Sequence, residues 1–378
     1  MKISFLTACL EPDRDGVGDY TRMLAGQCAA LGHECCLIGI ADQYAPGEND
    51  AGQGTELLRM PCHLPWEDRV GRARNHLAIF KPDFISFQFV SYSYNKKGLI
   101  AGIEKYIHEI VDERPLHIML HELWIGNCRR ARLKERCVGA LQRYFILRML
   151  RTLRPALTTV TIPLYFDFLK DAGQECSILP LFGNIPIAPP NPSWVLQSLR
   201  NCGIDIHTSN RHEFWCAGMF GSLHPSWPPE PLLTLLRANA IRYRRKLVIT
   251  SIGRLGPGRE LWNKLASLHG DVQFVDLGKQ PAPEISAYLQ EIDFGIAASP
   301  RTVIGKSGTA TAMAEHGLPV IVNWDDHETQ SSCDLPGGVN LRDGLDLAQI
   351  SRHRPIHGLP AVAEKFLTAL EERSQVPS

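Results

Sequence analysis

Hydrophobic and polar positions divide the start of the chain into three segments. An apolar run over residues 2–8 predicts a strand, and a glycine turn follows at 15–18. Residues 19–32 have the apolar spacing of a helix that ends at Gly32, and the apolar run 33–40 returns to strand. The chain therefore opens with a β-α-β unit, which is the repeating unit of parallel sheets.

The same alternation continues to about residue 182. Helical patterns near 66–80 and 98–112 separate apolar runs that predict strands at 57–60, 83–90 and 116–120. The runs at 156–162, 164–173 and 176–182 extend the alternation. An order of this kind predicts a parallel sheet with helices on both faces.

A proline-rich stretch separates this half of the chain from a second one. Residues 183–193 hold four prolines without periodicity, which is typical of a linker. Beyond it, five apolar runs predict a second α/β domain, and the chain ends in a helical pattern. We expect an N-terminal domain over 1–185, a linker over 186–212, a C-terminal domain over 213–352 and a tail helix over 353–378.

Composition narrows the class of protein. The 378 residues suit two domains, and 44% hydrophobic with 21% charged residues indicates a folded chain. Basic and acidic residues number 40 each, so net charge gives no reason to expect a nucleic-acid partner. Eleven cysteines without a Cys-x-x-Cys pair, and no apolar run near 18 residues, favour a reduced, cytoplasmic protein.

The segment 305–309, Gly-Lys-Ser-Gly-Thr, carries the strongest local chemistry. It imitates the end of an ATP-binding loop, but Pro300 replaces the first glycine of that motif, which leaves an NTPase as the less favoured alternative. Ser307, Gly308 and Thr309 are predicted to begin a helix, whose free N–H groups form an anion site beside Lys306. The alternative is a turn in which Ser307 only caps the helix.

Several stretches, taken in order, resemble the GT-B fold glycosyltransferases, especially those of family 4. The first half contributes the glycine loop with its helix and the strand that ends in a histidine: 15–34 and 116–124. The second half resembles the nucleotide-sugar domain of that family at 218–227, 247–260, 282–300 and 305–322.

The resemblance implies two Rossmann-like domains facing across a cleft and a hexosyltransferase activity. A sugar would pass from a nucleotide diphosphate sugar to a carbohydrate or other hydroxyl acceptor, without a metal or cofactor and with retained configuration. The sequence itself leaves donor, acceptor and stereochemistry open. Family 4 enzymes carry two glutamates eight positions apart where this chain has Ile304 and Ala312. A non-catalytic scaffold that binds a nucleotide or a partner protein is therefore the alternative.

The resemblance also implies the site residues. Family members place an arginine and a lysine near positions occupied here by Ser222 and His224, so Arg254 and Lys306 are expected to supply the charge for the diphosphate. The same group is expected to contact these two positions, the glycine loop and the helix start: Gly16, Gly18, Ser222, His224, Ser307, Gly308 and Thr309.

Three further features lie in the first half of the chain. The resemblance implies that His121 and Glu122 face the donor sugar as catalytic residues, the alternative being a histidine that bonds a backbone carbonyl. Tyr92 and Tyr94 suit stacking on an acceptor, although ordinary aromatic packing explains them as well. Residues 129–154 are basic with apolar residues between, which fits either peripheral contact with the inner membrane face or a solvated helix.

Overall fold

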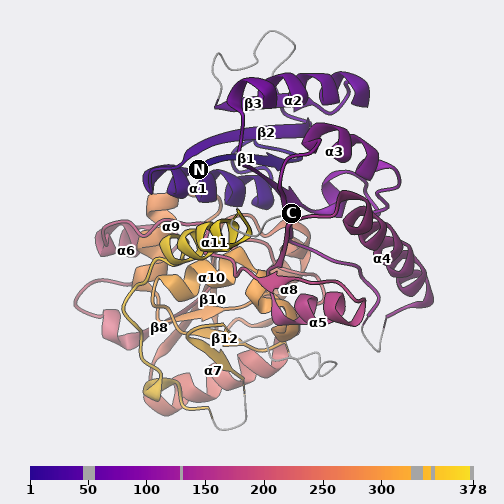
Figure 1. Ribbon diagram of the computed structural model, residues 1–378. Helices are drawn as coiled ribbons and strands as arrows, with labels where there is room; N and C mark the ends of the chain where they lie inside the picture. The colour runs from indigo at the N-terminus through magenta and orange to yellow at the C-terminus, as the bar shows by residue number, and fades with distance from the viewer. Residues whose placement is uncertain (46–55, 128–130, 325–334, 342–344, 375–378) are drawn as a thin grey trace. The chain divides into compact units, whose positions relative to one another are not determined.

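The computed structural model divides the chain into two compact units (Figure 1). The first unit contains residues 1–180 and the chain from 359 onward, and the second unit contains residues 181–358. The chain thus passes from the first unit to the second and back again. The structure describes residues 1–45, 56–127, 131–324, 335–341 and 345–374.

The first unit is built on a parallel sheet of seven strands in the order β3-β2-β1-β4-β5-β6-β7. Strands β1 and β4 at its centre are buried almost throughout, because helices cover both faces of the sheet. The strands are β1 (Lys2–Thr7), β2 (Glu34–Asp42), β3 (Leu57–Pro61), β4 (Phe84–Phe89), β5 (Leu116–Leu120), β6 (Leu157–Val160) and β7 (Ser177–Ile178).

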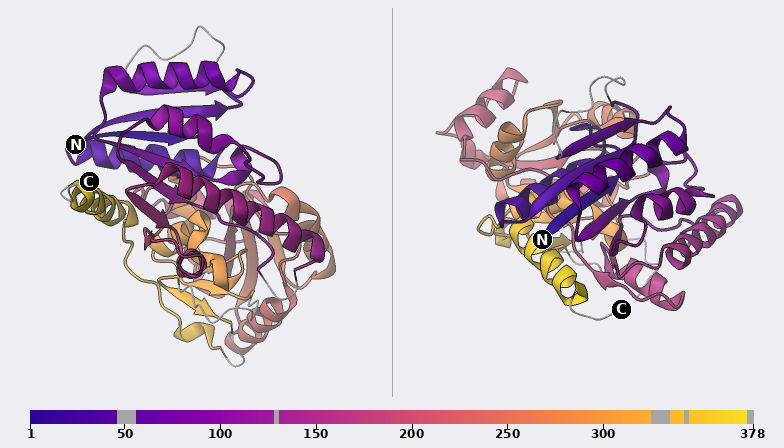
Figure 2. Two further views of the ribbon diagram at one scale, coloured as in Figure 1. Left: turned by 45° about the vertical axis from the view of Figure 1, so that its right-hand side comes forward. Right: turned by 45° about the horizontal axis from the view of Figure 1, so that its top comes forward.

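Helices from both ends of the chain cover this sheet. On one side α2, α3 and α4 contact one another in turn, and α2 packs on β2 and β3 (Figures 1 and 2). The last helix, α11, joins the first sheet through Phe366, whose ring lies 5.8 Å from Phe5 and 5.2 Å from His117. The helices are α1 (Gly16–Ala30), α2 (Trp66–Phe80), α3 (Ile103–Val111), α4 (Leu133–Leu153), α5 (Pro163–Asp171) and α11 (Gly358–Ser374), with a 3₁₀ turn at η1 (Ser91–Ser93).

The second unit repeats the architecture with six parallel strands in the order β10-β9-β8-β11-β12-β13. These are β8 (Phe214–Phe220), β9 (Lys246–Ile252), β10 (Gln273–Asp276), β11 (Phe294–Ile296), β12 (Val320–Val322) and β13 (Gly338–Asn340). The helices are α6 (Pro192–Asn201), α7 (Glu230–Tyr243), α8 (Arg259–Leu268), α9 (Ala282–Glu291) and α10 (Gly308–Glu315). Its 3₁₀ turns are η2 (Arg211–Glu213), η3 (Gly256–Gly258), η4 (Arg301–Lys306) and η5 (Leu347–Gln349).

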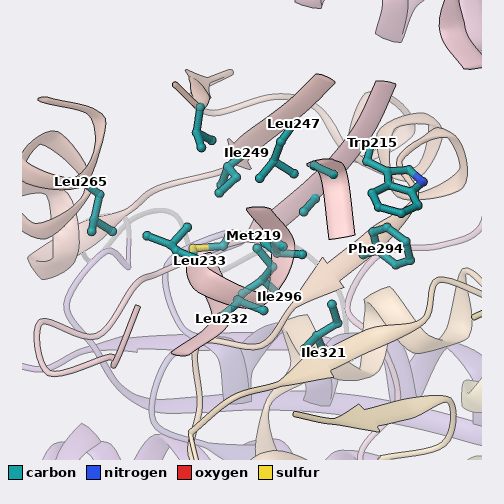
Figure 3. Close-up of a cluster of buried hydrophobic side chains, with 14 of the residues drawn as sticks. Trp215, Met219, Leu232, Leu233, Leu247, Ile249, Leu265, Phe294, Ile296 and Ile321 are labelled. Atoms are coloured by element: carbon teal, nitrogen blue, oxygen red, sulfur yellow. The ribbon is translucent and has the colours of Figure 1, made fainter. Parts of the chain in front are cut away.

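A hydrophobic core around β8 holds the second unit together (Figure 3). Trp215 and Met219 extend from β8, and the Trp215 ring meets Phe294 of β11 edge to face at 5.9 Å. Leu232 and Leu233 of α7 reach the same core. Burial of such large apolar side chains fixes the central strands, so the loops at the strand ends have a rigid base.

The two α/β units and their parallel sheets confirm the predicted fold class. The predicted linker 186–212 differs from what the structure shows, because it contains α6 and belongs to the second unit. Its proline-rich start is held by Ser286, whose Oγ accepts a hydrogen bond from the Ala188 N–H at 2.9 Å. Proline content alone does not separate a flexible linker from an extended segment whose polar groups are paired.

The predicted tail helix is α11, and the last four residues of the expected 353–378 range lie outside the described part of the chain. Within that part, no helix combines the length and the apolarity that crossing a membrane demands. The cysteines that the structure describes are all free thiols. The cytoplasmic location stays a prediction.

Candidate functional site

The carboxyl ends of β8, β9 and β11 form the edge at which the sequence placed the anion site. In the strand order, β9 and β10 lie on one side of β8 and β11 to β13 on the other, so the order in which the strands are added reverses at β8. In open parallel sheets such a switch point opens a crevice at the carboxyl ends of the strands, and ligands bind there. The loops 221–224 and 253–258 and the turn 301–307 follow these three strands.

Glycines let two of these loops lie against each other. The Gly221 N–H donates to the Ile252 carbonyl at 2.9 Å, and the Leu223 N–H donates to the Leu255 carbonyl at 3.1 Å. Gly221 and Gly253 have φ of +83° and +95°, a conformation that glycine adopts without strain. Arg254 follows Gly253 directly, so its backbone lies beside the loop that carries Ser222.

The start of α10 meets the same loops. A Cβ placed on Gly221 would lie 2.7 Å from Cγ2 of Thr309, which shows how closely the loop approaches the helix. Ser307 caps the helix, since its Oγ accepts from the Ala310 N–H at 3.3 Å and lies 3.1 Å from the Thr309 hydroxyl. Lys306 ends the 3₁₀ turn immediately before this cap. The predicted helix start at Ser307 to Thr309 is confirmed.

The structure therefore brings together the predicted diphosphate residues of the second half: Ser222, Arg254, Lys306, Ser307, Gly308 and Thr309. Arg254 is exposed, and no described residue holds it in a hydrogen bond or ion pair. His224 is exposed in the same loop, and its Nδ1 accepts from the Ser226 N–H at 3.0 Å while its ring lies 5.2 Å from Trp324. His224 thus has a local structural role that the sequence did not indicate.

The two positions at which family 4 enzymes carry glutamates are apolar in this chain and buried from solvent. Ile304 and Ala312 are both fully buried, and a Cβ on Gly183 would lie 2.7 Å from the Ala312 Cα. One turn further along α10, Glu315 accepts a hydrogen bond from the Gly183 N–H at 2.9 Å. Burial raises the pKa of Glu315, and bonds from the Gly183 and Gly358 backbone oppose this shift.

His316 is a second residue that the sequence reasoning missed. It is completely buried, with Nδ1 2.7 Å from the Ala312 carbonyl and Nε2 2.9 Å from the Ser286 hydroxyl. Burial lowers its pKa, so the ring is neutral, Nδ1–H donates and Nε2 accepts. Ser286 links this histidine to the proline-rich segment at Ala188. Only the adjacent Glu-His pair before the Gly-Leu-Pro turn could have signalled this.

The other predicted residues lie in the first unit. Gly18 is buried near the start of α1, and an added Cβ there would lie only 2.4 Å from the Cys9 carbonyl oxygen, whereas Gly16 has open space. Gly18 thus has a packing role, since it lets α1 approach the loop after β1. Contact of either glycine with the diphosphate remains a prediction.

His121 directly follows β5 as a buried, neutral imidazole. Its Nε2 donates to the Gln88 side-chain oxygen at 2.9 Å, and its ring packs edge to face on Tyr20 at 4.9 Å. Burial lowers the pKa of His121 to about 3. The alternative of a side-chain bond to a backbone carbonyl is not what is observed, because the partner is a side chain. Glu122 follows in the loop after β5 and is partly exposed.

A cavity of about 610 Å³ opens at the carboxyl ends of the strands β1 to β4. Tyr92 and Tyr94, the predicted acceptor residues, both line it, together with charged and aromatic side chains that include Arg14, Asp15, Tyr44, Trp66, Arg69 and Lys96. The Tyr92 hydroxyl accepts from Gln142 Nε2 at 2.9 Å. The Tyr94 ring stacks on Phe89 at 5.9 Å, and its buried hydroxyl has no hydrogen-bond partner among the described residues.

Burial and charge both act on the ionisable groups of this cavity. Burial raises the pKa of Tyr94, the Asp15 charge adds to the rise, and Arg69 opposes it. Burial also raises the pKa of Asp15, which caps α1 by accepting from the Val17 N–H at 3.0 Å.

A larger cavity of the first unit, of about 970 Å³, is lined by residues such as Asp83 and Arg154. It lies at the amino end of the sheet, whereas ligands of such sheets bind at the carboxyl end.

The described residues contain no group of three or more histidine, cysteine or acidic side chains placed to hold a metal ion. The charged groups at the candidate diphosphate site, Arg254 and Lys306, are both cationic.

Comparison with known proteins identifies solved structures that have a similar fold. No family model matches the chain, and neither does any curated protein. The structure is similar to WaaG, a glycosyltransferase of lipopolysaccharide biosynthesis, with a TM-score of 0.51 and 15% identity over 98% of this chain and 92% of that one.

Two more solved structures show the same likeness. A glycosyltransferase from Rickettsia africae gives a TM-score of 0.51 at 11% identity, over 98% of this chain and 88% of that one. The UDP-GlcNAc 2-epimerase of Methanocaldococcus jannaschii gives 0.50 at 10% identity, over 98% of this chain and all of that one. Glycosyltransferases and epimerases thus share one architecture with this chain, which has the two Rossmann-like units of the GT-B fold.

Proposed function

We propose that this protein is a glycosyltransferase that moves a sugar from a nucleotide diphosphate sugar to a hydroxyl acceptor. The observation that carries the proposal is the convergence of three strand-end segments in the second unit. Gly221 and Gly253 bring two loops together, and Thr309 at the start of α10 touches the first of them. The solved structures similar in fold include glycosyltransferases, which supports this choice of reaction.

The proposed chemistry lies in stabilising the departing diphosphate. When the bond between sugar and phosphate breaks, negative charge grows on the phosphate oxygens, and groups fixed near those oxygens lower the barrier. Arg254 and Lys306 supply positive charge, and the free N–H groups of the first turn of α10 add directed donors. With two cationic side chains in this role, the reaction needs no metal ion.

The acceptor is proposed to bind at the cavity of the first unit. Tyr92 and Tyr94 line this cavity as the proposed acceptor residues, beside polar side chains such as Asn95 and Lys96. The Tyr92 hydroxyl accepts from Gln142, so its own proton is left to donate to an acceptor hydroxyl. His121 does not line this cavity. Burial lowers its pKa and Gln88 takes its Nε2–H, so it offers a sugar only Nδ1 as an acceptor and no positive charge.

A second candidate is a GT-B scaffold that binds a nucleotide without transferring a sugar. The observation that favours it is the burial of Ile304 and Ala312, where the resembling family carries glutamates that hold the sugar and the ribose. Both candidates predict nucleotide binding. Only the transferase predicts turnover.

One experiment separates these functions. The protein is first titrated calorimetrically with UDP, GDP, ADP and TDP, and the sugar nucleotides of the bases that bind are then followed by phosphorus and proton NMR, with chelator present. Slow release of free nucleotide diphosphate supports the transferase, and Arg254→Ala should abolish it while Lys264→Ala, an exposed lysine of α8, should not. Binding without any change in the donor supports the scaffold. Conversion of the bound sugar to its epimer would contradict both.

A further inference from the structure

Helix α4 of the first unit exposes an apolar ridge to solvent. Leu133 is 79% exposed, Tyr144 is 53% exposed and Leu141 is 48% exposed. At 100° per residue these three positions fall on one face of the helix, and the buried Ile146, Met149 and Leu150 fall on the opposite face. Exposed apolar residues that line up in this way are unusual on a soluble surface and mark an interaction site.

Basic residues flank this ridge. Residues 131–154 contain seven basic side chains and a single acidic one, Glu135, in a chain whose charges balance overall. Glu135 Oε2 is occupied by the Arg132 N–H at 2.8 Å. Lys134, Arg143, Arg148 and Arg151 are exposed on α4, and one of them, Arg148, pairs with the buried Glu104 at 2.8 Å. We call Leu133, Leu141 and Tyr144 with these four basic residues the α4 outer face.

The helix is fixed to its unit, so the ridge is held outward. Gln142 on the inner side bonds the Ile125 N–H at 3.0 Å, the Tyr92 hydroxyl at 2.9 Å and the Lys97 carbonyl at 2.8 Å. Gly139 lies so close to the Ile125 carbonyl that no side chain fits between them. Within the first unit, α4 follows α3 at the end of the row of helices (Figure 2).

We propose that the α4 outer face binds the surface of an anionic lipid bilayer. An apolar ridge between basic flanks matches the headgroup and acyl regions of one leaflet. The leucines insert among the acyl chains, and the lipid phosphates attract the basic groups. Tyrosine at the edge of the ridge suits the boundary, where its ring is apolar and its hydroxyl is wet. Nucleic acid would match the basic residues but leaves the leucines without a partner.

The test is flotation of the full chain with vesicles at low and high salt. We expect binding to phosphatidylcholine mixed with phosphatidylglycerol, no binding to phosphatidylcholine alone, and release in high salt. Lys134→Gln with Arg151→Gln should weaken partitioning by roughly twenty- to thirty-fold. The matched control is Lys264→Gln with Lys365→Gln, which removes the same charge from exposed sites elsewhere and should leave partitioning unchanged. Each variant must melt at the temperature of the parent.

A fluorescence readout tests the ridge itself. In Tyr144→Trp, the added emission should shift to the blue on anionic vesicles and be quenched by brominated lipid, and Leu133→Asn should weaken binding on the same vesicles. Equal binding to neutral vesicles, no binding to either, or equal losses in the two pairs of charge variants would overturn the proposal. Duplex DNA retained by the parent and lost in the α4 pair, without vesicle binding, would assign the face to nucleic acid. Neither measurement requires a nucleotide, so the outcome is independent of the proposed enzyme activity.

Discussion

The carboxyl edges of the two sheets are constructed in different ways. In the first unit, polar side chains bond one another inside the protein, and a cavity with aromatic residues in its lining opens at the strand ends. In the second unit, the edge consists of glycine-containing loops, a helix start and an exposed arginine. Two units of the same architecture can therefore present different groups to a ligand. The first unit presents fixed side chains, and the second presents mainly backbone groups.

A buried chain of hydrogen bonds lies across the first sheet. His121 bonds Gln88, the Gln88 amide donates to Ser86, Ser86 lies 2.8 Å from His117, and His117 lies 2.9 Å from Thr159. Burial keeps His117 neutral, so it donates through one ring nitrogen and accepts through the other, and Ser86 and Thr159 take opposite roles toward it. Protonation of His117 would make both nitrogens donors and end this alternation.

The second unit leaves its edge open to an anion. Gly221, Gly253 and Gly256 all have positive φ, and the first two let backbone groups approach each other. Backbone N–H groups and a helix start attract negative charge without any titratable group. We therefore expect the first edge to respond to pH and the second to respond to changes in charge and backbone shape.

The largest expected effect is loss of the first unit in acid. Burial, with the neighbouring His121, lowers the pKa of His117 to about 3, and burial lowers that of His121 to about 3, against 6.5 in the unfolded chain. Between these values the unfolded chain binds more protons, so the stability present above pH 6.5 falls as the pH decreases toward 3. Each histidine lowers the free energy of unfolding by about 1.4 kcal/mol for every pH unit below 6.5. At two pH units below 6.5 the pair therefore lowers it by roughly 5 kcal/mol.

Hydrogen exchange followed by mass spectrometry checks this difference unit by unit. The second unit has one comparable ring, His316, whose pKa burial lowers as well. Protection of β4 and β5 should therefore be lost at a higher pH than that of β8 and β9. His117→Asn, which keeps an amide between Ser86 and the sheet interior, should reduce the slope of stability against pH. Simultaneous loss of protection in both units would contradict the assigned cause.

The second effect tests whether Gly18 is needed for packing. Gly18→Ala places a Cβ 2.4 Å from the Cys9 carbonyl, which must move, and we expect a loss of about 3 kcal/mol in the free energy of unfolding. Gly16→Ala adds the same methyl group into open space and should change stability by less than about 1 kcal/mol. Urea denaturation of both variants measures the difference. Equal losses of unfolding free energy in the two variants would mean that the close approach of Gly18 to Cys9 does not affect stability.

The sequence predicted the elements because their signals are local. Apolar runs and glycine turns predicted the strands. Ser307 predicted the start of α10, because a helix cap involves only the next three residues. Strand β13 was missed, since three residues with little burial give no apolar run.

The residues missed at the site depend on contacts over long stretches of chain. Glu315 bonds Gly183 and His316 bonds Ser286, so their roles follow from tertiary packing that no local pattern encodes. Gln142 likewise holds Tyr92 from a helix fifty residues away. The polar character of Gln88 and His117 inside apolar strands was visible in the sequence, but the order of bonds between them was not.

The third effect concerns the charge at the second edge. Lys306→Ala should weaken binding of the matching nucleoside diphosphate about ten- to a hundred-fold, because a charge-assisted bond contributes on the order of 1.5 to 3 kcal/mol. Arg254→Ala should act in the same direction. Calorimetry with the diphosphate and with the free nucleoside separates the causes, since nucleoside binding should not change. Unchanged diphosphate affinity in both variants would leave the segment 305–309 as a turn without a ligand.

The smallest effect decides between the two interpretations of Ser307, a helix cap alone or a cap within an anion site. Ser307→Ala removes the acceptor for the Ala310 N–H and should cost about 1 kcal/mol of stability. Ser307→Asn and Ser307→Asp both restore a good cap, so both should recover the melting temperature. They differ in charge, and only the aspartate should repel a diphosphate held at the same N–H groups. Asn and Asp variants of equal stability but unequal diphosphate affinity, measured by calorimetry, would identify this helix start as an anion site. Equal affinity would show that Ser307 serves the helix alone.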